Sequence, residues 1–416
     1  MPIFTLIFIG VLLATTATRL WLAQRHLHHV RQHRDAVPAD FAEHIALESH
    51  QKAADYSGAK TRLGMIHIVL DLAVLLAFTL GGGIQALADI WQSLVGDGLW
   101  RGVALIGSVL VIASLFDLPL GLYRTFVIDQ RFGFNKMTLG LFLGDLFKQV
   151  LIGAALGVPL LLGILWLMGQ MGTYWWLYAW LAWAGFNLAI LMLYPTVIAP
   201  IFNKFTPLED QALATRIEAL LQKCGFKSNG LFVMDGSRRT SHGNAYFSGL
   251  GASKRIVFFD TLLSRLSHDE IEAVLAHELG HFKRRHVIKR IATMFVLSLA
   301  GLWLLGWLMP QAWFYQGLGV SSQGTDTALL LFLLVSPVFT FLFQPLSSLY
   351  SRKHEFEADR YAAENADGEQ LIHALVKLYN DNAATLTPDP LHSVFYDSHP
   401  PAGQRVAHLR ALMNKN

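Results

Sequence analysis

Two histidines, His277 and His281, flank Glu278 in the run His277-Glu278-Leu279-Gly280-His281. On a helix, residues four apart lie one turn apart on the same face, so both imidazoles can reach one metal ion. Glu278 then lies beside that ion, where its carboxylate can accept a proton from an activated water. The spacing predicts a zinc-dependent hydrolytic centre with Glu278 as the general base. The competing interpretation is coincidence, since the chain has 17 histidines.

A catalytic zinc ion usually takes a third protein ligand from another element and keeps its fourth position open. The sequence offers Glu355, Glu357 and Asp359 downstream of the histidines. Glu355 and Asp359 are one turn apart on a helix, so one could bind the metal while the other orients a ligating histidine. Spacing alone does not choose among the three, and an acidic face on a solvated helix is the structural alternative.

The elements around the histidines can also be predicted. Ser267 and Glu270 have the spacing of a capping box, so we expect a helix that begins there and carries the motif. Upstream, the segments 231–234, 245–247 and 255–259 are typical of short strands separated by polar turns. We therefore expect a small β-ribbon followed by the helix.

Composition places this centre in a membrane protein. Of the 416 residues, 53% are hydrophobic and only 15% are charged, too apolar for a soluble enzyme of this size. The net charge of +3 is small and its basic residues are dispersed, so nucleic acid is excluded as a partner. Cys224 is the single cysteine, which excludes an intramolecular disulfide and a thiolate metal cluster.

Seven segments approach the length of about 20 apolar residues that a spanning helix needs. They are 3–23, 65–87, 102–123, 149–169, 175–198, 291–311 and 327–349. The first lacks a preceding basic residue, so we expect a retained helix and not a cleaved signal. The shorter apolar stretch 137–147 is interrupted by Asp145, and we expect it to lie at the membrane interface.

The distribution of Lys and Arg predicts the orientation. Loop 199–290 carries fourteen of them, whereas the loops after the fourth and sixth segments carry none. Because short cytoplasmic loops collect basic residues, we expect the amino terminus outside and both this loop and the carboxy-terminal tail in the cytoplasm.

The sequence resembles the Ste24-type, or type 1, CAAX prenyl proteases among the M48 metallopeptidases, over nearly its whole length. The resemblance is carried by several motifs together, namely 277–281, 355–359, Ser241-His242-Gly243-Asn244-Ala245-Tyr246-Phe247, Phe132-Gly133-Phe134-Asn135-Lys136, and His399-Pro400-Pro401 with Arg405.

The resemblance implies a role for each matching residue. Glu355 becomes the third ligand of one Zn²⁺ per chain, and Asp359 orients a ligand or donates a proton. Asn244 is expected on an edge strand beside the scissile bond. His399 and Arg405 are expected to contact the substrate or stabilise the oxyanion.

The implied fold is mainly α, with seven transmembrane helices in a barrel around a water-filled chamber and a small α+β zinc metalloprotease domain. We expect a membrane domain over 1–200 and the protease domain over 201–416, the latter including the last two spans. Asp71 and Asp117, inside predicted spans, are compatible with a chamber, because ionisable residues at membrane depth usually face a cavity or pair with each other. Alternatively, they lie at misjudged span ends.

The implied activity is removal of the last three residues from a prenylated CAAX protein, so the expected partners are the lipid bilayer and a peptide or protein substrate, prenylated or membrane-embedded. The compact chain and its His-Gly-Asn run at 242–244 suggest a bacterial member in the cytoplasmic membrane.

Three alternatives stay open. An HtpX-like quality-control protease is typically shorter, with fewer spans. A site-2-type protease has its zinc motif within a span, whereas basic residues directly follow the motif here, at 283–285. A transporter or channel with a structural metal would have no use for Glu278.

Overall fold

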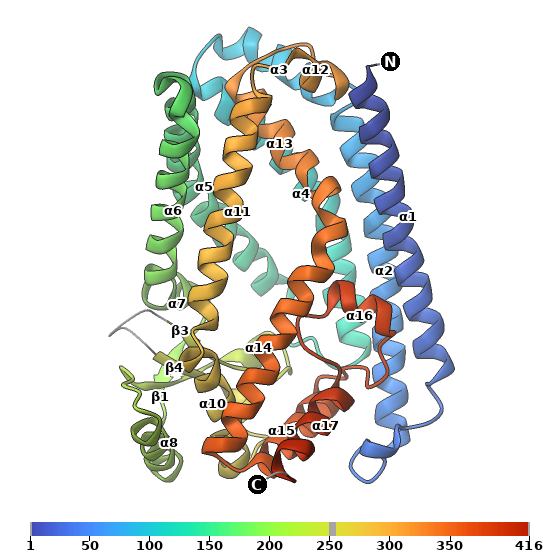
Figure 1. The fold of residues 1–416 in the computed structure, drawn as a ribbon, viewed down its shortest axis with the longest axis vertical. Helices are drawn as coiled ribbons and strands as arrows, with labels where there is room; N and C mark the ends of the chain where they lie inside the picture. The colour runs from blue at the N-terminus through green and yellow to red at the C-terminus, as the bar shows by residue number, and fades with distance from the viewer. Residues whose placement is uncertain (1, 249–254, 415–416) are drawn as a thin grey trace.

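Seven helical segments long and apolar enough to cross a membrane make up most of the chain, as predicted. The structure is a computed structural model that describes residues 2–248 and 255–414. The segments are Ile3–Gln32 (α1), Leu47–Phe78 (α2), Leu99–Asp129 (α4 and a π-helical end), Leu139–Gln170 (α5), Gly172–Phe202 (α6 and α7), His286–Leu308 (α11) and Thr325–Asn365 (α13 and α14). They stand side by side from α6 to α1, with α11 and α14 in front of α5 and α4 (Figure 1).

Some spans contain more than one helix. The helices within these composite spans are α4 (Leu99–Tyr123), α6 (Trp175–Leu193), α7 (Ala199–Phe202), α13 (Thr325–Thr340) and α14 (Gln344–Asn365). The remaining helices are α3 (Gly83–Val95), α8 (Gln211–Cys224), α9 (Asp260–Leu263), α10 (His268–Lys283), α12 (Ala312–Gly317), α15 (Gly368–Asp381), α16 (Pro390–Tyr396) and α17 (Ala402–Met413). α14 runs well beyond the predicted span end at 349, and this extension carries the acidic residues of the site.

One predicted span end is wrong. The second span ends at Phe78 and not at 87, because Gly82 adopts a φ of 79° and the chain turns into the separate helix α3. Asp145 lies inside α5, which begins at Leu139 and continues into the fourth segment, and the expected place of 137–147 at the membrane interface stays a prediction. Asp145 is buried, but its carboxylate accepts hydrogen bonds of 2.8 and 3.1 Å from Arg239. This pairing offsets the cost of burying the charge and joins α5 to the loop after β2.

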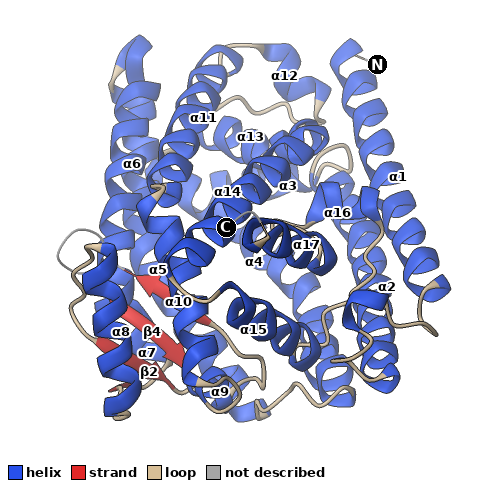
Figure 2. Cartoon of the chain, turned by 60° about the horizontal axis from the view of Figure 1, so that its bottom comes forward, coloured by secondary structure: helices blue, strands red, loops and turns tan. Residues whose placement is uncertain are grey.

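The three predicted strands are confirmed as β2 (Leu231–Met234), β3 (Ala245–Ser248) and β4 (Arg255–Phe259). A fourth strand, β1 (Phe205–Pro207), was not predicted. The sheet has the order β1-β2-β4-β3, with β2 and β4 parallel and the other pairs antiparallel, so it is a mixed sheet and not a ribbon. β3 is an edge strand. α8 and α10 lie beside the sheet (Figure 2), and their buried side chains pack together with those of β4 in one core.

The predicted capping box is present at the start of α10. Ser267 accepts from the Glu270 amide, and the Glu270 side chain accepts from the Ser267 amide. α10 then packs against α14 at very close range. A Cβ atom at Gly280 would lie 2.9 Å from the Cα atom of Ala358. This contact between two small residues brings the histidines of α10 up to the acidic residues of α14.

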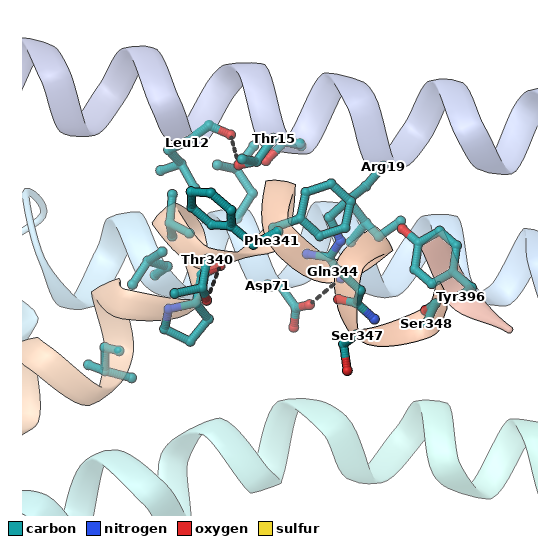
Figure 3. A pocket seen from close by; sticks show the side chains of 18 of the residues that line it. Leu12, Thr15, Arg19, Asp71, Thr340, Phe341, Gln344, Ser347, Ser348 and Tyr396 are labelled. Atoms are coloured by element: carbon teal, nitrogen blue, oxygen red, sulfur yellow. Dashed lines mark hydrogen bonds and ion pairs between the residues drawn. The ribbon is translucent and has the colours of Figure 1, made fainter. Parts of the chain in front are cut away.

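A cavity of about 1210 Å³ lies between α1, α2 and the α13–α14 segment. Asp71 lines it and faces Arg19 at 3.5 Å, as Figure 3 shows. Asp117 is not among the lining residues, but His67 lies within 3.3 Å of Asp71 and 3.0 Å of Asp117. The two predicted intramembrane aspartates therefore join through one histidine into a single polar cluster beside the cavity.

The close approach of α10 and α14 predicts the effect of one added methyl group. Gly280→Ala should lower the free energy of unfolding by about 1–3 kcal/mol, because the new Cβ overlaps the backbone of α14. Thermal unfolding in detergent measures the change. The control is Gly153→Ala in α5, where a Cβ meets nothing within 4 Å. Equal stability of the two variants would contradict the packing account.

Candidate metal centre

Three side chains from two helices converge at one point. His277 and His281 lie one turn apart on α10, and Glu355 comes from α14. One donor atom from each residue lies within 4.8 Å of the others. The Nε2 atoms of the two histidines are 3.2 Å apart, and Glu355 lies 3.5 Å from His277 and 3.4 Å from His281. These are the residues that the sequence and the resemblance pointed to.

A carboxylate on the next turn of α14 holds His277. The Nδ1 atom of His277 lies 2.8 Å from Asp359, and since a carboxylate only accepts, Nδ1 carries the proton. In the neutral imidazole, Nε2 of His277 is then left with its lone pair toward Glu355 and His281. Asp359 is fully buried and is held in turn by Arg405, whose Nε donates to it at 2.9 Å.

A longer chain of contacts holds His281. Its Nδ1 atom lies 2.9 Å from Nδ1 of His286, and Nε2 of His286 lies 3.0 Å from Glu357. Because Glu357 accepts from Nε2, neutral His286 presents a lone pair at Nδ1, and His281 must donate to it. Nε2 of His281 therefore also keeps its lone pair toward the centre. His354 stacks on His286, with centroids 4.0 Å apart, and fixes its plane.

These contacts test whether the residues fit a metal ion. Two ring nitrogens 3.2 Å apart repel each other if both present lone pairs, so this pair needs a cation, either a proton on Nε2 of His277 or a metal ion near both atoms. Oε2 of Glu355 is buried and has no hydrogen-bond partner among the described residues. Two neutral imidazoles and a carboxylate are also a common donor set for a catalytic zinc ion. The three residues fit a metal ion.

The charges around the two histidines support the same conclusion. Burial alone would lower the pKa of His277, but contact with Asp359 and Glu355 raises it to about 9. Burial and the neighbouring His277 lower the pKa of His281 to about 3. The site therefore stabilises one positive charge against its carboxylates, a position that a metal cation can take.

Glu278 follows His277 on α10 and is half-buried. Burial raises the pKa of its carboxyl group. A carboxylate with a raised pKa is a stronger base, which suits a residue that accepts a proton from water.

The other expected residues differ in their exposure and in their contacts with the centre. His399 lies 3.6 Å from Glu355 with 62% of its side chain exposed, so it remains accessible to a ligand. Arg405 is buried against Asp359 and reaches Glu355 at 3.9 Å. Asn244 is exposed and immediately precedes β3, and its carbonyl accepts from the Phe259 amide.

His286 is a residue of the centre that the sequence reasoning missed. It lies five residues after His281, a spacing that points away from His281 on a continuous helix. The helix is not continuous, because Arg285 adopts a φ of 57° between α10 and α11 and turns the chain back. Glu357, one of the open alternatives for the third ligand, contacts His286 instead of the centre.

The His281–His286–Glu357 chain predicts a change in metal affinity. His286→Phe keeps the ring but removes the acceptor for His281, and should weaken metal binding about 10-fold or more. Competition with a chelator measures the affinity. His354→Phe is the control, since the new ring can still stack on His286 and leaves the acceptor for His281 in place. Unchanged affinity in His286→Phe would contradict the contact chain.

Comparison with known proteins places the chain in one family. Residues 26–204 match the family model described as CAAX prenyl protease N-terminal, five membrane helices, and residues 207–413 match peptidase family M48. CAAX prenyl protease 1 homolog of Caenorhabditis elegans is 33% identical, with 99% of each chain covered. CAAX prenyl protease 1 of Saccharomyces cerevisiae is 32% identical over 91% of this chain and 89% of its own.

The similarity extends to a solved structure and to the human relative. The crystal structure of S. mikatae Ste24p superposes with a TM-score of 0.90 at 30% identity, over 98% of this chain and 99% of that one. CAAX prenyl protease 1 homolog of Homo sapiens is 30% identical over 99% of this chain and 97% of its own. The chain belongs to peptidase family M48, among the type 1 CAAX prenyl proteases, and is a multi-pass integral membrane metalloprotease.

Proposed function

We propose that the chain is a zinc metalloendopeptidase that removes the carboxy-terminal tripeptide from prenylated CAAX proteins. The observation that carries the proposal is the convergence of His277, His281 and Glu355 within 4.8 Å, with Glu278 beside them on α10. The substrate class comes from the names of the relatives, which cover almost the full length of the chain.

His277, His281 and Glu355 would hold the zinc ion. When bound, zinc supplies a Lewis acid that polarises the scissile carbonyl and makes the attacking water more acidic. Glu278 accepts the proton of that water and passes it to the amine that leaves. Asp359 and the His286–Glu357 pair keep the two imidazoles in the tautomer that leaves Nε2 free.

Three further residues would position the substrate. β3 is an edge strand preceded by the exposed Asn244, so an extended peptide can lie along it with Asn244 beside the scissile bond. The exposed ring of His399 is suited to contact the substrate or the oxyanion. Arg405 would act on the substrate indirectly, by holding Asp359, because its guanidinium is already paired with that carboxylate.

The distribution of basic residues supports an orientation of the chain in the membrane. We propose that the amino terminus lies outside and that the carboxy-terminal half, from 201 to 416, forms the protease domain with its centre on the cytoplasmic side. The fourteen basic residues of loop 199–290 support this orientation. A bacterial cytoplasmic membrane stays a prediction from sequence, and the relatives named above are eukaryotic.

The alternatives have less support. A quality-control protease of the HtpX type would share the metal centre but is shorter than this chain, which matches the Caenorhabditis elegans relative over 99% of both lengths. A transporter or channel with a structural metal would not need Glu278 beside the ligands. Both would leave a prenylated CAAX peptide uncut.

Glu278→Gln separates metal binding from catalysis. The variant should retain about one zinc per chain, because all three ligands remain, but its kcat on a farnesylated CAAX peptide should fall by at least about 100-fold, the contribution of a general base. Glu364→Gln on the exposed surface of α14 is the control. Full activity in Glu278→Gln would support a structural metal and contradict the proposal.

Removal of the metal provides an independent test. Dialysis against a chelator should abolish cleavage and lower the unfolding temperature, because a ligand that binds the native state stabilises it. One equivalent of Zn²⁺ should restore both, and Mg²⁺ should restore neither, since it prefers oxygen ligands. Retention of full activity by protein shown to be metal-free would contradict a zinc mechanism.

A further inference from the structure

A second cavity, of about 490 Å³, lies beside the metal centre. Its walls come from α2, from the segment after α15 and from the stretch that carries His399. His399 lies 3.6 Å from Glu355, so this cavity adjoins the centre through that residue. Lys60 of α2 also lines it. The cavity therefore connects the neighbourhood of the metal ligands with a lysine from a different part of the chain.

Lys60 has no carboxylate within 4 Å among the described residues, although it lies in a half-buried position. Its ammonium group lies over the ring of Tyr56, 4.1 Å from the centroid. The charges that act most strongly on it are those of Arg124 and Asp129, which have opposite signs. Asp129 already accepts a hydrogen bond from the Tyr56 hydroxyl at 2.8 Å.

The other side chains of the cavity do not neutralise Lys60. Asp397 is the acidic residue among those that line it, and no ion pair joins it to Lys60 among the described residues. The remaining polar lining consists of histidines, hydroxyl groups and the amphipathic ring of Tyr379. A half-buried ammonium without a carboxylate partner is poorly solvated, so it favours an anion that enters the cavity.

We propose that Lys60 binds the terminal carboxylate of the peptide substrate. This inference rests on the proposed function, in which cleavage releases the last three residues. Three extended residues span about 10 Å, so a carboxylate at the chain end lies well away from the scissile bond. The cavity begins at His399 and reaches Lys60, and its volume lies in the range of about 300–1,000 Å³ that small ligands occupy.

This arrangement gives the centre a means to measure distance from the end of the chain. A substrate that continues past the third residue would bring an uncharged peptide group to Lys60 in place of a carboxylate. Lys60 would therefore be a specificity residue that contacts the substrate, while His277, His281, Glu355 and Glu278 perform the chemistry.

The test compares two farnesylated CAAX peptides that differ only in their last group, a free carboxylate or an amide. Wild-type protein should cleave the carboxylate peptide with a kcat/KM at least about 10-fold higher than that of the amide peptide, which is the contribution expected of a charge-assisted hydrogen bond. The difference should lie mostly in KM. Lys60→Met keeps an unbranched side chain of similar length without the charge, and it should bring the ratio of the two kcat/KM values close to one. Lys60→Arg, which keeps the charge, should retain most of the wild-type preference for the carboxylate.

Lys52→Met is the matched control. Lys52 is also on α2 and also lies over an aromatic ring, 5.0 Å from the centroid of Phe134, but it does not line the cavity. The control should keep the wild-type ratio. A wild-type ratio near one, or an unchanged ratio in Lys60→Met, would overturn the proposal while leaving the proposed function intact. Failure of wild-type protein to cleave either peptide would overturn both.

A second measurement covers the case in which Lys60→Met does not fold. The product tripeptide should inhibit the wild-type enzyme at least about 10-fold more strongly as the free acid than as the amide. Equal inhibition by the two forms would overturn the carboxylate site.

Discussion

The contact between α10 and α14 is the constraint on which the rest of the metal centre depends. Gly280 immediately precedes His281 on α10 and faces Ala358, so the two helices approach until their backbones nearly touch. At that distance Glu355 reaches both imidazoles from across the interface. A larger residue at either position would separate the helices, and a separation of one or two ångströms would remove the third ligand from its place.

Three acidic residues of α14 use this helix contact in different ways. Glu355 faces the centre itself, Asp359 fixes His277, and Glu357 fixes His281 through His286. Each imidazole is therefore held at Nδ1 and free at Nε2. Arg405 balances the buried charge of Asp359 from the carboxy-terminal helix α17, which links the last part of the chain to the centre.

Much of this site could be predicted from local spacing, and the rest depends on contacts that spacing does not encode. The motif at 277–281, its capping box and three strands follow from local patterns, and all are present. The choice among the acidic residues of α14 depends on which face meets α10, and the resemblance to a known family pointed to Glu355. His286 was missed because its position depends on a single left-handed residue, Arg285. The burial of Asp145 inside α5 could not be predicted, because its partner Arg239 is 94 residues away.

The most direct test of the central claim is anomalous diffraction at the zinc absorption edge from crystals of the full chain. The account predicts one peak, within about 2.0–2.2 Å of Nε2 of His277, Nε2 of His281 and a carboxylate oxygen of Glu355. A peak at the second group of potential ligands, His67, Asp71 and Asp117, with none at the first would contradict the account. So would a zinc ion held by Glu357 in place of Glu355.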